Sequence, residues 1–139
     1  ILIENEFSNK NDDIKIKIIP LEDMYINIFQ WKPNIDTNVF KKIFPNILDT
    51  NNFAKKNTTF NIPTKDSIKD YTFRLWFPDN TDLTTVQENL FFIGTKNPIN
   101  FHELYSWEDF NKKIIELSQS SLKYREKNKL YVIRKINIH

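Results

Sequence analysis

The side chains that most often carry enzyme chemistry are scarce in this sequence. The chain has no cysteine and only two histidines, His102 and His139, so cysteine nucleophiles, thiolate metal sites and disulfides are excluded. His102 precedes Glu103, but adjacent residues of a strand point to opposite faces, so this pair could exchange a proton only across a turn. We therefore interpret His102 as a surface histidine, and we predict no catalytic residue and no metal site.

Other kinds of site fail for lack of glycine and of suitably spaced acids. The single glycine, Gly94, excludes the glycine-rich loops that hold nucleotide phosphates and the glycine pair around a serine nucleophile. Asp79 and Asp82 follow Pro78 in a segment typical of a turn, without the alternating ligands and distal glutamate of a calcium loop. We therefore expect a non-catalytic protein that needs no cofactor.

The small positive charge does not indicate a nucleic-acid partner. Twenty Lys and Arg residues against eighteen Asp and Glu residues give a net charge of +2, and abundant Lys, Ile and Asn are typical of AT-rich coding sequences. A basic aromatic sheet face that stacks bases could be formed by Lys15, Lys17, Arg74, Arg134 and Lys135, together with Trp76 and Tyr131. Ordinary alternation with lysine on the solvent side accounts for the same residues, so no nucleic acid is expected.

Length and composition predict one domain behind a flexible leader. A chain of 139 residues with twelve Phe and three Trp can bury a single core without disulfides or metal. Residues 4–13 are polar and without periodicity, so we predict a leader over residues 1–13 and one domain over residues 14–139. The chain begins with Ile1 and not with Met, which leads us to expect that a signal peptide or anchor has been removed.

Alternating apolar residues predict several strands. Residues 14–18 alternate Ile with Lys, and residues 24–31 form a β-branched and aromatic run, so we expect an antiparallel hairpin joined by the turn at residues 20–23. Further strands are expected at residues 58–63, 71–77, 90–95 and 129–139.

Residues 36–55 are expected to form a small helical insertion. Asp36 and Thr37 are suitable N-caps, and apolar residues recur at helical spacing from Val39 to Leu48. Pro45 interrupts this stripe, which predicts a kink or two short helices.

Residues 106–124 are compatible with a helix or a strand. Ser106 with Asp109 fits a capping box, and apolar residues at helical spacing also favour a helix. Residues 112–118 fit a strand as well, because a short apolar run cannot be assigned by its period alone. The fold is therefore either a mainly β sandwich or an α+β fold with a C-terminal helix packed on an antiparallel sheet.

Taken in order, these elements resemble the outer-membrane lipoprotein of the bacterial type VI secretion membrane complex, the TssJ family. The resemblance covers roughly residues 14–95. It rests on YINIFQW at residues 25–31, the apolar stripe at residues 39–48, TFNIP at residues 59–63 and the strand pair within residues 71–94. It implies a transthyretin-like β-sandwich with a small helical insertion, and it implies a strand at residues 112–118, which we adopt.

The resemblance also implies a function. A member of this family is a non-catalytic lipoprotein that is anchored to the outer membrane through an acylated cysteine and faces the periplasm. It binds the periplasmic domain of the inner-membrane partner, TssM, through the first loop between strands. That loop corresponds here to Pro20, Leu21, Glu22 and Asp23, and it is shorter than is usual in the family. The alternative is a cytoplasmic α+β interaction module, such as an immunity protein or a complex subunit.

Overall fold

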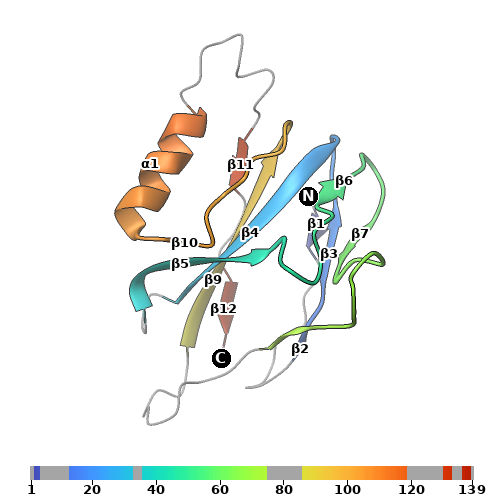
Figure 1. Ribbon diagram of the computed structural model, residues 1–139, viewed down its shortest axis with the longest axis horizontal. Coiled ribbons are helices and arrows are strands. Elements are labelled where there is room, and N and C mark those ends of the chain that lie inside the picture. Colours follow the sequence, from blue (N-terminus) through green and yellow to red (C-terminus); the bar gives the residue numbers. More distant parts are fainter. Residues whose placement is uncertain are drawn as a thin grey trace.

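The computed structural model describes residues 2–3, 13–32, 36–74, 86–118, 130–132 and 136–138 of the chain. These residues form antiparallel sheets, one of them strongly curled into a half-barrel, and one helix toward the C-terminus (Figure 1). The prediction of a mainly β protein is confirmed.

The strands of the described residues form three sheets. In chain order they are β1 (Leu2–Ile3), β2 (Asp13–Ile14), β3 (Ile16–Ile19), β4 (Met24–Lys32), β5 (Asp36–Phe44), β6 (Phe53–Ala54), β7 (Phe60–Ile62), β8 (Phe73–Arg74), β9 (Val86–Thr95), β10 (Leu104–Tyr105), β11 (Leu130–Val132) and β12 (Ile136–Ile138). The largest sheet has the order β10-β5-β4-β9-β11, with β12 paired to β9 and β6 to β4. The second has the order β1-β3-β7, and β2 pairs with β8 in the third.

The long pairing of β4 with β9 forms the centre of the largest sheet. It runs without interruption from Tyr25 opposite Thr95 to Trp31 opposite Asn89. Successive side chains of a strand point to opposite faces, so the fully buried neighbours Ile28 and Phe29 enter two different hydrophobic cores.

These two cores lie on opposite faces of the β4 and β9 region. Core 1 joins the β1-β3-β7 sheet to the largest sheet, and core 2 lies beneath the helix, which covers the other face (Figure 1). The buried residues of core 1 are Ile16, Ile18, Met24, Ile26, Ile28, Phe44, Ala54, Ile62, Leu90 and Phe92. Those of core 2 are Phe29, Phe40, Ile93, Phe101, Phe110 and Leu117.

The predicted hairpin of residues 14–18 and 24–31 is wrong, although both strands exist. β3 pairs with β1 and β7, whereas β4 pairs with β5, β6 and β9. The turn at residues 20–23 therefore carries the chain from one sheet to the other. Ile16 and Ile18 of β3 and Ile26 and Ile28 of β4 are buried in core 1 from its two sides, which is the packing that an alternating pattern also allows.

The helical insertion predicted at residues 36–55 is wrong. Residues Asp36–Phe44 form β5, and β6 follows at Phe53–Ala54. The register between β4 and β5 shifts twice. A bulge at Ile43 separates Phe44 opposite Ile28 from Lys42 opposite Phe29, and a larger irregularity separates Lys41 opposite Gln30 from Asp36 opposite Lys32. A bulge places apolar residues at irregular spacing, and here that spacing resembles the period of a helix.

The strand adopted for residues 112–118 is also wrong, because Trp107–Ser118 form helix α1. The local signals for a helix are present in the structure. The Asp109 N–H donates to the Ser106 hydroxyl at 3.1 Å, and Glu108 pairs with Lys112 at 3.3 Å. Phe110 and Leu117 enter core 2, so packing and capping favour the same conformation.

The remaining predicted elements are placed as follows. β7, β8 and β9 lie within or across the strands predicted at residues 58–63, 71–77 and 90–95, and β11 and β12 lie within residues 129–139. Residues 75–77 lie outside the described residues. Of the predicted leader, Leu2–Ile3 and Asp13 lie in strands β1 and β2, and the rest lies outside the described residues.

Candidate functional site

The candidate site is built on a segment that interrupts a ladder of strands. β7 pairs with β3, ending with Ile62 opposite Ile16, and β8 pairs with β2, starting with Phe73 opposite Ile14. On one side of the ladder, Lys15 alone separates β2 from β3. On the other side, residues 63–72 separate β7 from β8 and leave the sheet. Interruptions of regular pairing often re-aim side chains next to functional sites. We call residues 63–72 the excursion.

A buried carboxylate joins the excursion to the turn that follows β5. Asp49 is fully buried, and its carboxylate accepts hydrogen bonds from the backbone N–H of Thr64 at 2.8 Å and from the hydroxyl of Thr64. The hydroxyl of Tyr71 donates a further bond to Asp49 at 2.8 Å. A buried carboxylate is costly unless such donors surround it, so these contacts fix Thr64 and Tyr71 relative to the turn.

The phenol of Tyr71 is held in its protonated form. Burial raises the pKa of Tyr71 above the usual 10.0, a hydrogen bond with Asn46 opposes the rise, and the carboxylate of Asp49 adds to it. A protonated phenol serves as a hydrogen-bond donor and not as a base. The arrangement is suited to holding two segments together.

Further hydrogen bonds join the same two segments. The Ile68 N–H donates to the carbonyl of Leu48 at 2.7 Å, and the side-chain amide of Asn51 donates to Asp66 at 3.0 Å. Within the turn, the Leu48 N–H donates to the side-chain oxygen of Asn46 at 3.0 Å. We call residues 45–51 and the excursion together the locked loop pair.

The locked loop pair displays two large aliphatic side chains to solvent. Ile47 is 86% exposed and Ile68 is 76% exposed. The Ile68 N–H contacts the residue next to Ile47, so the two isoleucines lie on neighbouring turns. Single exposed apolar residues are common, but here a buried hydrogen-bond network holds both of their loops.

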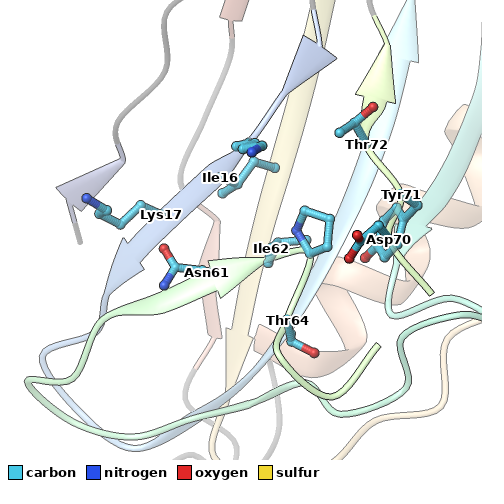
Figure 2. Close-up of a pocket in the computed structure, with 10 residues that line it drawn as sticks. Ile16, Lys17, Asn61, Ile62, Thr64, Asp70, Tyr71 and Thr72 are labelled. Carbon is cyan, nitrogen blue, oxygen red and sulfur yellow. The ribbon is translucent and has the colours of Figure 1, made fainter. Parts of the chain in front are cut away.

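A cavity of about 790 Å³ lies on the other side of the excursion, between it and β3 (Figure 2). Thr64 and Tyr71 line it, so the residues that bind Asp49 also form part of the cavity wall. Figure 2 shows Lys17 and Asn61 at one end of the cavity and Asp70 at the other.

The structure places the predicted partner-binding turn against a different segment, the turn at residues 55–58. Pro20 is buried, and its carbonyl accepts the Asn57 N–H at 2.8 Å. The carboxylate of Asp23 accepts the Lys56 N–H at 2.7 Å. Leu21 is 67% exposed, and Glu22 is half-buried. None of these four residues lines the cavity.

The other residues weighed from the sequence are not brought together into a site. His102 is exposed and lies against the ring of Tyr105, whereas Glu103 pairs with Lys42 at 3.5 Å. Among the described residues, no group of three or more His, Asp or Glu side chains is placed to hold a metal ion. Residues 76, 79, 82, 134, 135 and 139 lie outside the described residues.

Sequence reasoning missed the residues of the locked loop pair. Asp49 and Ile47 fall within the stretch that the sequence predicts to be helical. In such a helix, an aspartate is expected to face solvent and an isoleucine to belong to the apolar stripe. The sequence does signal that turns begin at Pro45-Asn46 and at Pro63-Thr64, because these residue types favour turns. They mark the start of both loops but do not show that the loops meet.

Comparison of the chain with protein-family models, curated proteins and solved structures gave no match. In the part of the chain that the structure describes, no helix is long and apolar enough to cross a membrane.

Proposed function

We propose that this chain is a non-catalytic module that binds another protein through the locked loop pair. The observation that carries the proposal is the exposure of Ile47 and Ile68 on loops that a buried carboxylate holds in place. Binding through preorganised loops loses less conformational entropy than binding through mobile ones. Exposed aliphatic side chains supply the apolar surface that a partner would bury.

The hydrogen bonding of the site supports binding over catalysis. Both carboxylate oxygens of Asp49 accept hydrogen bonds from the chain's own groups, and Tyr71 is kept protonated. A general base needs a lone pair that the substrate can reach and that is unprotonated at the working pH. Here the Asp49 oxygens already accept internal hydrogen bonds, and the Tyr71 oxygen carries its proton.

Substitution of the two isoleucines tests the binding proposal. The double variant Ile47→Asp, Ile68→Asp is expected to lose binding by tenfold or more, because it places charge in the apolar contact. Ile115→Asp, which changes a 52% exposed isoleucine on α1, is the matched control. Partners are identified by quantitative cross-linking in the native cell and purified, and their dissociation constants are measured for all three proteins. Equal affinity for the wild type and the double variant would exclude this surface.

On the resemblance of residues 14–95 to the TssJ family, we propose a specific setting for this binding. The chain acts as the periplasmic lipoprotein of a type VI secretion membrane complex, anchored to the outer membrane, and its partner is the periplasmic domain of a TssM-like protein. A transthyretin-like sandwich is supported by core 1, which joins two antiparallel sheets. The exposed Leu21, on a turn pinned by Asp23, is a second contact in this proposal.

The anchor and the partner can be tested separately. Mass spectrometry of the full-length gene product is expected to find an acylated cysteine upstream of Ile1, and Leu21→Asp is expected to weaken binding to a purified TssM periplasmic domain. A full-length protein without that cysteine contradicts the lipoprotein role but leaves the isoleucine surface untouched.

One observation favours the second candidate, a cytoplasmic interaction module such as an immunity protein or complex subunit. α1 packs on the largest sheet through Phe110, as that alternative predicts, where the resemblance implies a strand. Fractionation of the native cell separates the two settings, because the lipoprotein is expected with the outer membrane and the module in the cytosol.

A further inference from the structure

The cavity beside the excursion carries opposite charges that do not pair with each other. Lys15 and Asp70 both line it and are both exposed. Neither takes part in an ion pair or a hydrogen bond with a described residue. Lys17 adds a second ammonium group on the strand side of the cavity (Figure 2). The walls therefore attract an anion on one side and a cation on the other.

The position and the volume of the cavity suit an extended chain. It opens where residues 63–72 leave the ladder, so Lys15 is the one position between β2 and β3 that has no strand partner. A gap in a strand ladder is the place where an extended segment can approach the exposed backbone. The volume of about 790 Å³ lies in the roughly 300–1,000 Å³ range of ligand pockets.

Polar side chains are also available for a peptide backbone. Asn61 and Thr72 line the cavity and are exposed. Neither side chain has a hydrogen-bond partner among the described residues. An amide and a hydroxyl can both donate and accept, as the N–H and C=O groups of a peptide require.

We propose that this cavity binds a short extended peptide segment that carries a carboxylate toward Lys15 and an ammonium toward Asp70. The proposal rests on the proposed function, since it makes the segment part of the bound protein, and it adds a charge-selective contact to the apolar contact of the two isoleucines. Opposite charges on the two walls select the direction in which the segment lies, because a reversed segment would place like charges together.

Synthetic peptides provide the probe. The capped tetrapeptide acetyl-Glu-Thr-Val-Lys-amide, titrated into ¹⁵N-labelled protein, is expected to shift the backbone amide signals of Lys15, Asn61 and Thr72. The neutral acetyl-Gln-Thr-Val-Gln-amide is expected to bind two- to fivefold more weakly, the difference that exposed ion pairs produce. Equal shifts with both peptides, or none at millimolar concentration, would overturn the proposal.

Charge reversal makes the test specific. Asp70→Lys is expected to weaken binding of the Glu/Lys peptide two- to fivefold and to bind acetyl-Glu-Thr-Val-Glu-amide better than the wild type does. Lys55→Glu, an exposed lysine outside the cavity, is the control and is expected to leave both affinities unchanged. If Asp70→Lys does not bind the Glu/Glu peptide better than the wild type does, Asp70 is not the residue that faces the ammonium group.

The outcome is independent of the isoleucine experiment. Loss of partner binding in the Ile47→Asp, Ile68→Asp variant together with silent peptide titrations would remove the cavity and keep the proposed function. Peptide binding together with unchanged partner binding in the double variant would remove the isoleucine surface and keep the cavity as the contact.

Discussion

Two buried polar side chains of this protein have opposite surroundings. Asp49 is fully buried and has three hydrogen-bond donors around its carboxylate. Asn27 is 1% exposed, and neither polar atom of its side chain has a hydrogen-bond partner among the residues that the structure describes. A satisfied buried group contributes specificity, whereas an unsatisfied one costs free energy. The two residues are therefore expected to respond in opposite ways to an apolar substitution.

Replacement of the Asp49 carboxylate is expected to destabilise the fold. Asp49→Ala leaves the Thr64 N–H and the Tyr71 hydroxyl without their acceptor, and the free energy of unfolding should fall by about 2–4 kcal/mol. Urea unfolding measures it. Asp66→Ala is the control, because the carboxylate of the exposed Asp66 accepts a hydrogen bond from the Asn51 amide in an exposed position, and it should change stability by no more than about 0.5 kcal/mol. Similar losses in both variants would contradict the assigned role of Asp49.

Tyr71 is expected to make the protein sensitive to alkaline pH. Its pKa is raised in the folded state above the ordinary 10.0, so above that pH the folded protein holds more protons than the unfolded chain. The free energy of unfolding must then fall as the pH rises further. Urea unfolding between pH 9 and 12 should show a steeper loss in the wild type than in Tyr71→Phe. Parallel curves would show that the phenol does not contribute.

Substitution of Asn27 is expected to stabilise the protein. Asn27→Leu keeps the number of side-chain heavy atoms and removes two unpaired polar atoms, so the free energy of unfolding should rise by about 1 kcal/mol. Asn52→Leu is the matched control, since the Asn52 amide donates to the Ile26 carbonyl at 2.9 Å, and it should lower stability. A loss in the Asn27 variant would show that the amide has a role in the fold.

At the scale of elements, α1 is held to the sheet by aromatic packing. The ring of Phe110 stacks on Phe40 with 4.4 Å between centroids and lies 5.1 Å from Phe29. A 12-residue helix is marginal on its own, so this contact and the Ser106 cap together account for its position.

The aromatic contact should dominate the stability of the helix. Phe110→Ala is expected to lower the free energy of unfolding by about 3–5 kcal/mol, because it leaves a cavity in core 2. Ile115→Ala, on the exposed side of the same helix, should change it by no more than about 0.5 kcal/mol. Equal effects in chemical denaturation would mean that α1 does not pack as described.

At the scale of the whole molecule, the two cores share one sheet. Ile28 and Phe29 are adjacent in β4, both fully buried, and each enters a different core. A defect in either core is therefore transmitted through the same pairing of β4 with β9. This arrangement favours one cooperative unit, and the single domain over residues 14–139 stays a prediction.

Cooperativity can be measured directly. Unfolding of Ile28→Ala and of Phe29→Ala is followed by far-ultraviolet circular dichroism and by tryptophan fluorescence. Within each variant, the two probes are expected to give the same urea midpoint. Trp31 and Trp107 lie beside core 2, so fluorescence reports that side when both variants are made in a Trp76→Phe background. An Ile28→Ala variant whose two midpoints separate would show that the cores unfold independently.

Several local elements could be predicted because their signals lie close together in the sequence. The alternation of residues 14–18 and 24–31 predicted β3 and β4, and the Ser106 cap with the apolar spacing after it indicated α1. The pairing of the strands could not be predicted, because alternation specifies which face is buried and not which strand lies alongside. The bulge in β5 likewise mimics a helical period until its partner β4 is known.

The sequence alone therefore determined the composition of the chain, the positions of most of its strands and the scarcity of catalytic side chains. Only the tertiary structure decided the candidate site. Asp49 contacts Thr64 and Tyr71, which lie 15 and 22 residues away in the sequence. The cavity forms where β7 pairs with β3 and β8 pairs with β2, the strand just before it. Such contacts depend on which segments the fold brings together, and no local pattern encodes that choice.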